Sequence, residues 1–155
     1  MNPASATGSN ATGSISLITQ LSRVIYRRAT KDVIGMGLKQ LIALDHLYVN
    51  RGCLQQALGQ TLMLDANNCV ILLNDLDELG YIERRRDPSD RRRHLVEITP
   101  AGVEALKQAE GRLESLEDEV LGNLDPEERA QLRELLAKAI DGQETDAACG
   151  SAEGA

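Results

Sequence analysis

Apolar residues recur at helical spacing through most of the chain. The stretch ISLITQLSRVIYRRATKDVI places an aliphatic side chain at every third or fourth position, which predicts one amphipathic helix over residues 15–34. The stretches LKQLIALDHLYVN, LQQALGQTL and DANNCVILLNDLDELG predict three more helices. The last of these has Asp65 as an N-cap and Gly80 as a C-terminal stop.

The pattern changes after Gly80. YIERRR and RHLVEIT are short strand-like runs on either side of DPSD, a sequence typical of a tight turn. Thr99-Pro100 and Asp125-Pro126 each combine an N-cap residue with proline at the first helical position, and they predict helices over residues 101–121 and 126–140. The expected fold is therefore mainly α with a small β-hairpin, in the order α-α-α-α-β-β-α-α.

The length of 155 residues fits one domain. We expect that domain over residues 15–140. Residues 1–14 and 141–155 are rich in small and polar residues and lack periodicity, which predicts a flexible N-terminal arm and a flexible tail.

Charge is unevenly distributed along the chain. The formal net charge is −7, yet six arginines and two aspartates between Arg84 and Arg93 give this segment a local charge of +4. The acidic residues gather in the C-terminal helices, so a chain that is acidic overall can still present a cationic segment to phosphate. Guanidinium groups fork onto phosphate and enter a narrow minor groove readily.

Several classes of protein are disfavoured. No apolar run is long enough to predict a membrane span. There is no Ser-His-Asp set, phosphate-binding loop or metal-ligand spacing, so we expect neither an enzyme nor a cofactor. The N-terminus does not look like a secretory signal and the three cysteines are unpatterned, which predicts a cytoplasmic protein.

Two short helices with a tight connection, the second of them over residues 65–79, are followed by a basic hairpin. This order is typical of a winged helix-turn-helix. In that arrangement the second helix of the helix-turn-helix enters the major groove of double-stranded DNA, and the hairpin is the wing.

The segment LDELGYIERRRDPSDRRRHLVEITPAG resembles the signature of the MarR family of bacterial transcription regulators. That signature is a helix ending L-x-x-x-G, a strand, D-P-x-D-x-R, a second strand and L/I-T-x-x-G. The matching positions are Leu76, Gly80, Tyr81, Asp87, Pro88, Asp90, Arg92, Ile98, Thr99 and Gly102. The resemblance implies a homodimer built on helices 15–34, 101–121 and 126–140, which binds a pseudo-palindromic operator. It also implies a repressor released by a small-molecule effector, often a phenolic or anionic aromatic compound.

The resemblance further assigns roles within the wing. Asp90 would pair with Arg92 and orient it, and Arg92 would reach into the minor groove. Arg84, Arg86 and Arg91 would contact the DNA backbone or act as alternates. The alternative interpretation is that the hairpin is simply a solvated charged turn.

The expected recognition helix departs from the family pattern. Val70 and Ile71 stand where relatives often carry Thr-Arg, and the helix has no basic residue. Base reading would fall to Asn67 and Asn68, since asparagine can bond to adenine N6 and N7, while Ile71 could touch thymine methyl groups. A low-specificity architectural DNA binder therefore remains an alternative.

Cysteine chemistry leaves a second alternative open. Cys69 lies within the expected recognition helix and Cys53 at the start of the helix before it. They are either small buried thiols or the sensors of an oxidation-responsive regulator. The candidate effector-binding residues are Arg23, Tyr26, His46 and Tyr48, each of which also has an ordinary structural interpretation.

Overall fold

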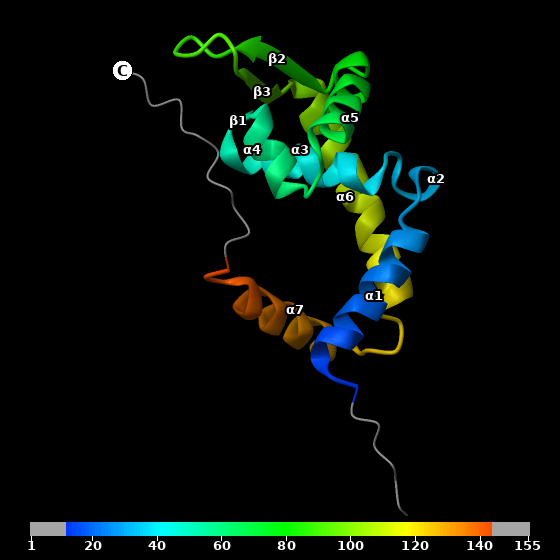
Figure 1. The fold of residues 1–155 in the computed structure, drawn as a ribbon. Coiled ribbons are helices and arrows are strands. Elements are labelled where there is room, and N and C mark those ends of the chain that lie inside the picture. Colours follow the sequence, from blue (N-terminus) through cyan, green and yellow to red (C-terminus); the bar gives the residue numbers. More distant parts are fainter. Residues whose placement is uncertain (1–11, 144–155) are drawn as a thin grey trace, which may run out of the picture.

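The structure is a computed structural model that describes residues 12–143. Seven helices and three strands fill this range (Figure 1). In chain order they are α1 Ser14–Arg28, α2 Lys31–Ile34, α3 Leu38–Asn50, β1 Cys53–Leu54, α4 Gln55–Thr61, α5 Ala66–Glu78, β2 Ile82–Arg86, β3 His94–Ile98, α6 Pro100–Val120 and α7 Pro126–Ile140. The predicted fold class is confirmed, and two short elements, α2 and β1, are added to the predicted order.

The predicted helix over residues 15–34 is broken at Ala29 and Thr30, where the backbone leaves the helical conformation. Ala29 and Ile34 are buried together against Leu116 of α6. In one continuous helix these two side chains would point about 140° apart. The break therefore lets both of them pack on α6, a tertiary gain that the periodicity of the sequence does not show.

Cys53 lies in strand β1 and not, as predicted, at the start of a helix. Arg51 and Gly52 have positive φ angles of 54° and 110°, which turn the chain back after α3. Cys53 then pairs with Val96, so that the antiparallel sheet has the order β1-β3-β2. A strand of two residues is too short to produce a detectable alternation.

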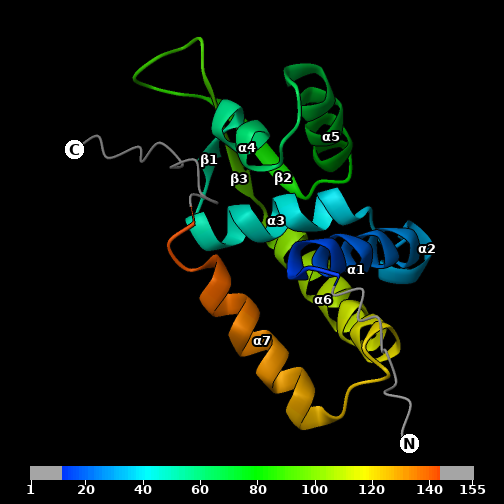
Figure 2. The ribbon, with the colours of Figure 1, turned by 60° about the horizontal axis from the view of Figure 1, so that its bottom comes forward.

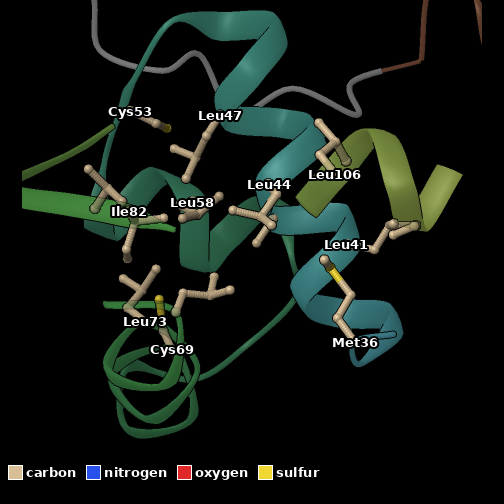
Figure 3. Packing of buried hydrophobic residues seen from close by; sticks show 14 of the residues in the cluster. Met36, Leu41, Leu44, Leu47, Cys53, Leu58, Cys69, Leu73, Ile82 and Leu106 are labelled. Atoms are coloured by element: carbon tan, nitrogen blue, oxygen red, sulfur yellow. The ribbon is translucent and has the colours of Figure 1, made fainter. Parts of the chain in front are cut away.

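The main core lies where α3, α4, α5, the sheet and the start of α6 meet (Figure 3). Its largest fully buried side chains are aliphatic and include Leu44, Leu47, Leu58, Leu73 and Ile82. This core fixes the inner face of α5 and the base of the β2–β3 hairpin in one rigid lobe.

The two ends of the molecule differ in character. Both ribbon views place α5 and the β2–β3 hairpin at one end, while α7 extends away at the other (Figures 1 and 2). Neither α1 nor α7 contributes a fully buried residue. Within residues 12–143, no helix is long and apolar enough to cross a membrane.

Candidate nucleic-acid interface

Helices α4 and α5 form the helix-turn-helix, and Asp65 begins the second of them. Asp65 Oδ1 accepts a hydrogen bond from the Asn68 backbone N–H at 2.8 Å, and Oδ2 accepts one from Asn68 Nδ2 at 2.7 Å. The backbone bond, followed by the side-chain bond, lowers the pKa of Asp65. A carboxylate therefore closes the N-terminus of α5, and the Asn68 amide is used in capping.

The outer face of α5 is set by its buried face. Cys69, Leu73 and Leu76 point into the core, so the opposite side carries Asn67, Ile71 and Asn74 at i, i+4 and i+7. All three of these outward residues are exposed. Of the two predicted base-reading asparagines, only Asn67 lies on the outer face with its side chain free of hydrogen bonds to residues 12–143.

The helix brings no positive charge of its own to this face. Between Asp65 and Leu79 there is no lysine or arginine, and four side chains are acidic: Asp65, Asp75, Asp77 and Glu78. Exposed apolar surface is contributed by Val70 and Ile71, which are 37% and 51% exposed. The helix can therefore offer amides and methyl groups to DNA but no cation for phosphate.

The wing consists of β2, β3 and the loop between them. The loop is closed by the Asp87 N–H, which donates to the Arg93 carbonyl at 3.0 Å. Asp87 is buried, and its Oδ1 accepts from the Ser89 N–H at 2.9 Å and the Ser89 hydroxyl at 2.7 Å. These bonds, the hydroxyl bond first, lower the pKa of Asp87. An ionised aspartate thus holds the start of the loop in shape.

The six wing arginines divide into two groups. Three are paired with acidic side chains: Arg84 with Asp77, Arg85 with Glu97 and Arg93 with Asp90. The other three are Arg86, Arg91 and Arg92, which are exposed and make no side-chain hydrogen bond or ion pair with any residue in the range 12–143. These three are the cations available to phosphate.

The predicted ion pair between Asp90 and Arg92 is wrong in its detail. Asp90 Oδ1 accepts from the Arg92 backbone N–H at 3.0 Å, and Oδ2 lies 3.8 Å from Nε of Arg93. The reason is local, because an aspartate in a turn reaches the backbone N–H two residues further on. Asp90 therefore orients Arg92 through its backbone and leaves its guanidinium group unpaired.

Arg84 is also placed differently from the prediction. Its Nη2 donates to Asn74 Oδ1 at 2.8 Å, and its Nε and Nη2 donate to Asp77 Oδ2 at 3.1 and 2.9 Å. Only 23% of the side chain is exposed. Arg84 is therefore a tie between the wing and α5, and it is not free to contact the DNA backbone without giving up these bonds.

A cavity of about 400 Å³ lies between α4, the start of α5 and the wing. The residues that line it are Leu54, Gln55, Gln56, Gly59, Gln60, Leu64, Ala66, Cys69, Val70, Arg92, Arg93 and His94. Cys69 is buried, its Sγ donates to the Gln55 carbonyl at 3.8 Å, and burial raises the pKa of the thiol. A raised pKa disfavours the reactive thiolate.

The four candidate effector residues are not brought together. Arg23 and Tyr26 are exposed on α1, and Tyr48 is exposed near the end of α3, where it lines a surface groove with Val49. His46 is buried, with its Nδ1 3.4 Å from Asn50 Nδ2 and its Nε2 3.8 Å from Cys53 Sγ. Among the described residues, no group of His, Cys, Asp or Glu could hold a metal ion.

Sequence comparisons point to one family. A family model described as the MarR family matches residues 34–93. The transcriptional regulatory protein assigned to the hcr operon of Thauera aromatica is 31% identical over 126 residues, which cover 81% of this chain and 73% of that protein. The HTH-type transcriptional regulator BilQ of Clostridium symbiosum is 30% identical over 110 residues, which cover 70% of this chain and 74% of that protein.

Solved structures share the fold. The apo form of MarR from E. coli aligns with a TM-score of 0.75 at 24% identity, over 83% of this chain and 96% of that one. A mutant of the same protein complexed with operator DNA aligns with a TM-score of 0.65 at 24% identity, over 80% of this chain and 91% of that one.

Proposed function

This chain belongs to the MarR family of transcriptional regulators, and from that premise we propose that it is a homodimeric repressor that holds its operator mainly through the wing. The single observation that carries this proposal is the division of charge between the two DNA-facing elements. Within residues 12–143, three wing arginines have no side-chain partner, whereas α5 has three acidic side chains, a fourth at its N-cap Asp65, and no basic one. Phosphate contacts supply most of the affinity of such proteins for DNA.

The proposed role of each DNA-facing residue follows from its position. Arg86, Arg91 and Arg92 contact phosphates or the minor groove, while Asp90 sets the backbone of the wing tip. Asn67 and Ile71 face the base edges in the major groove, and Asn68 stabilises the start of α5 through Asp65. In this proposal the chain acts by binding DNA and has no catalytic role.

Substitution of wing arginines tests the proposal. Arg92→Ala should lower the affinity for a duplex operator and reduce the slope of log K against log salt by about one unit for each wing. Arg85→Ala is the matched control, because it removes the same charge from the same hairpin but from a residue already paired with Glu97 at 2.6 Å. Fluorescence anisotropy over a salt series measures both. Equal slopes for Arg92→Ala and the wild type would contradict the wing proposal.

We further propose that a small phenolic or other anionic aromatic compound releases the protein from DNA. The cavity under the wing supports this proposal, because its lining combines apolar groups with Arg92, Arg93 and His94. A ligand that neutralised Arg92 there would compete directly with DNA. A panel of phenolic acids added to the preformed complex tests this, and the absence of release by any of them, with an unrelated neutral aromatic compound as control, would contradict it.

Two alternative functions, an oxidation-responsive regulator and a low-specificity architectural DNA binder, receive less support. An oxidation sensor needs an accessible thiolate, whereas Cys69 is buried and its pKa is raised. A low-specificity architectural binder would need no base-reading surface. Competition between the operator and random DNA distinguishes this class, because a specificity ratio near one favours the architectural role.

A further inference from the structure

We propose that Asn74 of α5 reads a base with a major-groove acceptor, a purine or thymine, and that Arg84 of the wing strand holds the Asn74 amide in the orientation needed for this reading. This inference rests on the proposed function, in which α5 faces the major groove. It adds a specificity-determining residue and a positioning residue to that function.

The position of Asn74 is the first support. It lies on the outer face of α5, opposite the buried face formed by Cys69, Leu73 and Leu76. Asn67 and Asn74 are seven residues apart on the same face, which is about 10 Å along the helix axis. Base pairs are spaced by about 3.4 Å along the duplex axis, so a helix that lay along the groove would bring these two amides to base pairs about two or three steps apart.

The orientation of the amide is the second support. Arg84 Nη2 donates to Asn74 Oδ1 at 2.8 Å. A guanidinium group has no acceptor, so the oxygen of the amide must be the atom that faces it. The Nδ2 group is therefore turned away from Arg84 and makes no hydrogen bond with any residue in the range 12–143. Its two N–H groups are free to donate.

Asp77 fixes the orientation of Arg84 and, through Arg84, the orientation of the Asn74 amide. Its Oδ2 accepts from both Nε and Nη2 of Arg84, at 3.1 and 2.9 Å, and fixes the plane of the guanidinium group. The side chains of Arg84 and Asp77 are only 23% and 44% exposed. Because the rotamer of Asn74 is held before DNA arrives, less conformational entropy is lost when a base is bound.

The chemistry of the free donor selects the base. In the major groove adenine and guanine present the N7 acceptor, guanine adds O6 and thymine presents O4, whereas cytosine presents only the N4 amino donor. An outward N–H donor at position 74 is therefore matched to a purine or thymine and mismatched to cytosine. Since Asp77 neutralises Arg84, the arrangement adds no net charge, and it should affect sequence preference far more than salt dependence.

Selection from a random duplex pool tests the inference, with the wild type, Asn74→Asp and Asn67→Asp compared in parallel. Aspartate at position 74 keeps an acceptor for Arg84 but replaces the donor by a second acceptor, which suits the N4 amino group of cytosine. We expect one position in each half-site to change from a purine or thymine to cytosine by about tenfold or more in relative enrichment. The substitution Asn67→Asp should change a different position, about two or three base pairs away.

A role that is only structural predicts a different result. If Asn74 serves merely as an acceptor for Arg84, Asn74→Asp retains the wild-type preference at every position, and the inference is overturned. If the wild type itself enriches no sequence, the proposed function fails, and the inference fails with it for a separate and recognisable reason.

Chemical substitution in the DNA provides a test that does not depend on the folding of a variant. Where the selected base is a purine, replacing it by its 7-deaza analogue removes only the N7 acceptor, so wild-type affinity should fall several-fold at that position and at no neighbouring non-contacted purine. The positioning role is tested with Arg84→Lys, which keeps the charge beside Asp77 but cannot bond to both partners with the same planar fork. This variant should relax the preference at the same position while leaving the salt slope within about 0.5 unit of the wild type. Undiminished binding to the 7-deaza operator would overturn the inference.

Discussion

At the scale of single residues, the wing depends on aspartates as much as on arginines. Asp87 and Asp90 both accept hydrogen bonds from backbone N–H groups of the loop, from Ser89 and from Arg92 respectively. Each carries a negative charge next to a surface meant for phosphate, which by itself opposes DNA binding. The role of these two aspartates is to set the shape of the loop, because their hydrogen bonds fix the backbone that carries Arg91 and Arg92.

The pH dependence of stability tests this role of Asp87. Its folded pKa is lowered by hydrogen bonds from Ser89, so the ionised form stabilises the native loop at pH values above the unfolded pKa, and this contribution is lost as the pH falls through the lower, folded pKa. Asp87→Asn keeps an acceptor but cannot ionise. Its free energy of unfolding should therefore fall less steeply than that of the wild type as the pH is lowered from about 5 to about 2, as measured by urea unfolding.

DNA binding gives the companion measurement. Asp87→Ala removes the acceptor for Ser89, and we expect lower affinity at neutral pH although the variant is less negative. Ser89→Ala, which removes only the hydroxyl donor, should have a smaller effect. An Asp87→Ala protein that binds more tightly than the wild type would show that charge, and not loop shape, is the dominant effect of this residue.

At the scale of elements, the junction between the wing and α6 is held by one close approach. Thr99 caps α6 by accepting from the Gly102 N–H at 3.1 Å, and its hydroxyl donates to the Gly80 carbonyl at 2.6 Å. A Cβ atom on Gly102 would lie only 2.1 Å from the Tyr81 carbonyl oxygen. The glycine is therefore needed so that the start of α6 can pack against the backbone that enters β2.

Two glycine-to-alanine substitutions in α6 should have opposite effects. Gly102→Ala forces the start of α6 away from the Tyr81 backbone and should lower the free energy of unfolding by about 1–3 kcal/mol. Gly111→Ala, in the same helix, meets no atom within 4 Å and should raise it by about 0.5–1 kcal/mol, because alanine favours helix. Chemical denaturation of both variants tests the pair, and equal effects would refute the close-approach explanation.

The elements that the sequence predicted correctly are those with local signals. The cap at Asp65, the Thr99-Pro100 start of α6 and the hairpin around Asp87 are all encoded within a few neighbouring residues. The break at Ala29 and the strand at Cys53 were missed because each exists only through a distant partner, Leu116 in one case and Val96 in the other.

The candidate site was predicted only in part for the same reason, because contacts between distant parts of the chain are not visible in the sequence. The wing arginines could be found as a cluster, but their division into paired and unpaired groups depends on contacts across elements. Asp77 of α5 meets Arg84 of β2, and Glu97 of β3 meets Arg85. Asn74 was overlooked because nothing in the sequence of α5 places it beside a wing arginine.

At the scale of the whole molecule, helices α1 and α7 leave apolar side chains exposed in a single chain. Helices α1 and α7 bury no residue fully, yet Ile15 and Ile18 of α1 are 77% and 48% exposed, and Leu135 and Ile140 of α7 are 57% and 54% exposed. Apolar surface of this extent on long helices is typical of an interface between subunits. A second copy of the chain is the partner that the proposed repressor requires, because two wings must meet two half-sites.

Disrupting this interface should affect association and DNA binding together. Leu135→Glu places a charge on the apolar side of α7 and should shift the protein from dimer to monomer in sedimentation experiments. Ala137→Glu adds the same charge to an exposed position about 160° around the same helix from Leu135 and should leave the dimer intact. A monomer reaches one half-site, so the salt slope of Leu135→Glu for the full operator should fall to about half of the wild-type value, because half of the phosphate contacts are lost. If Leu135→Glu and Ala137→Glu dimerise equally well, α7 does not form the interface, and another surface must bring the two wings to the two half-sites.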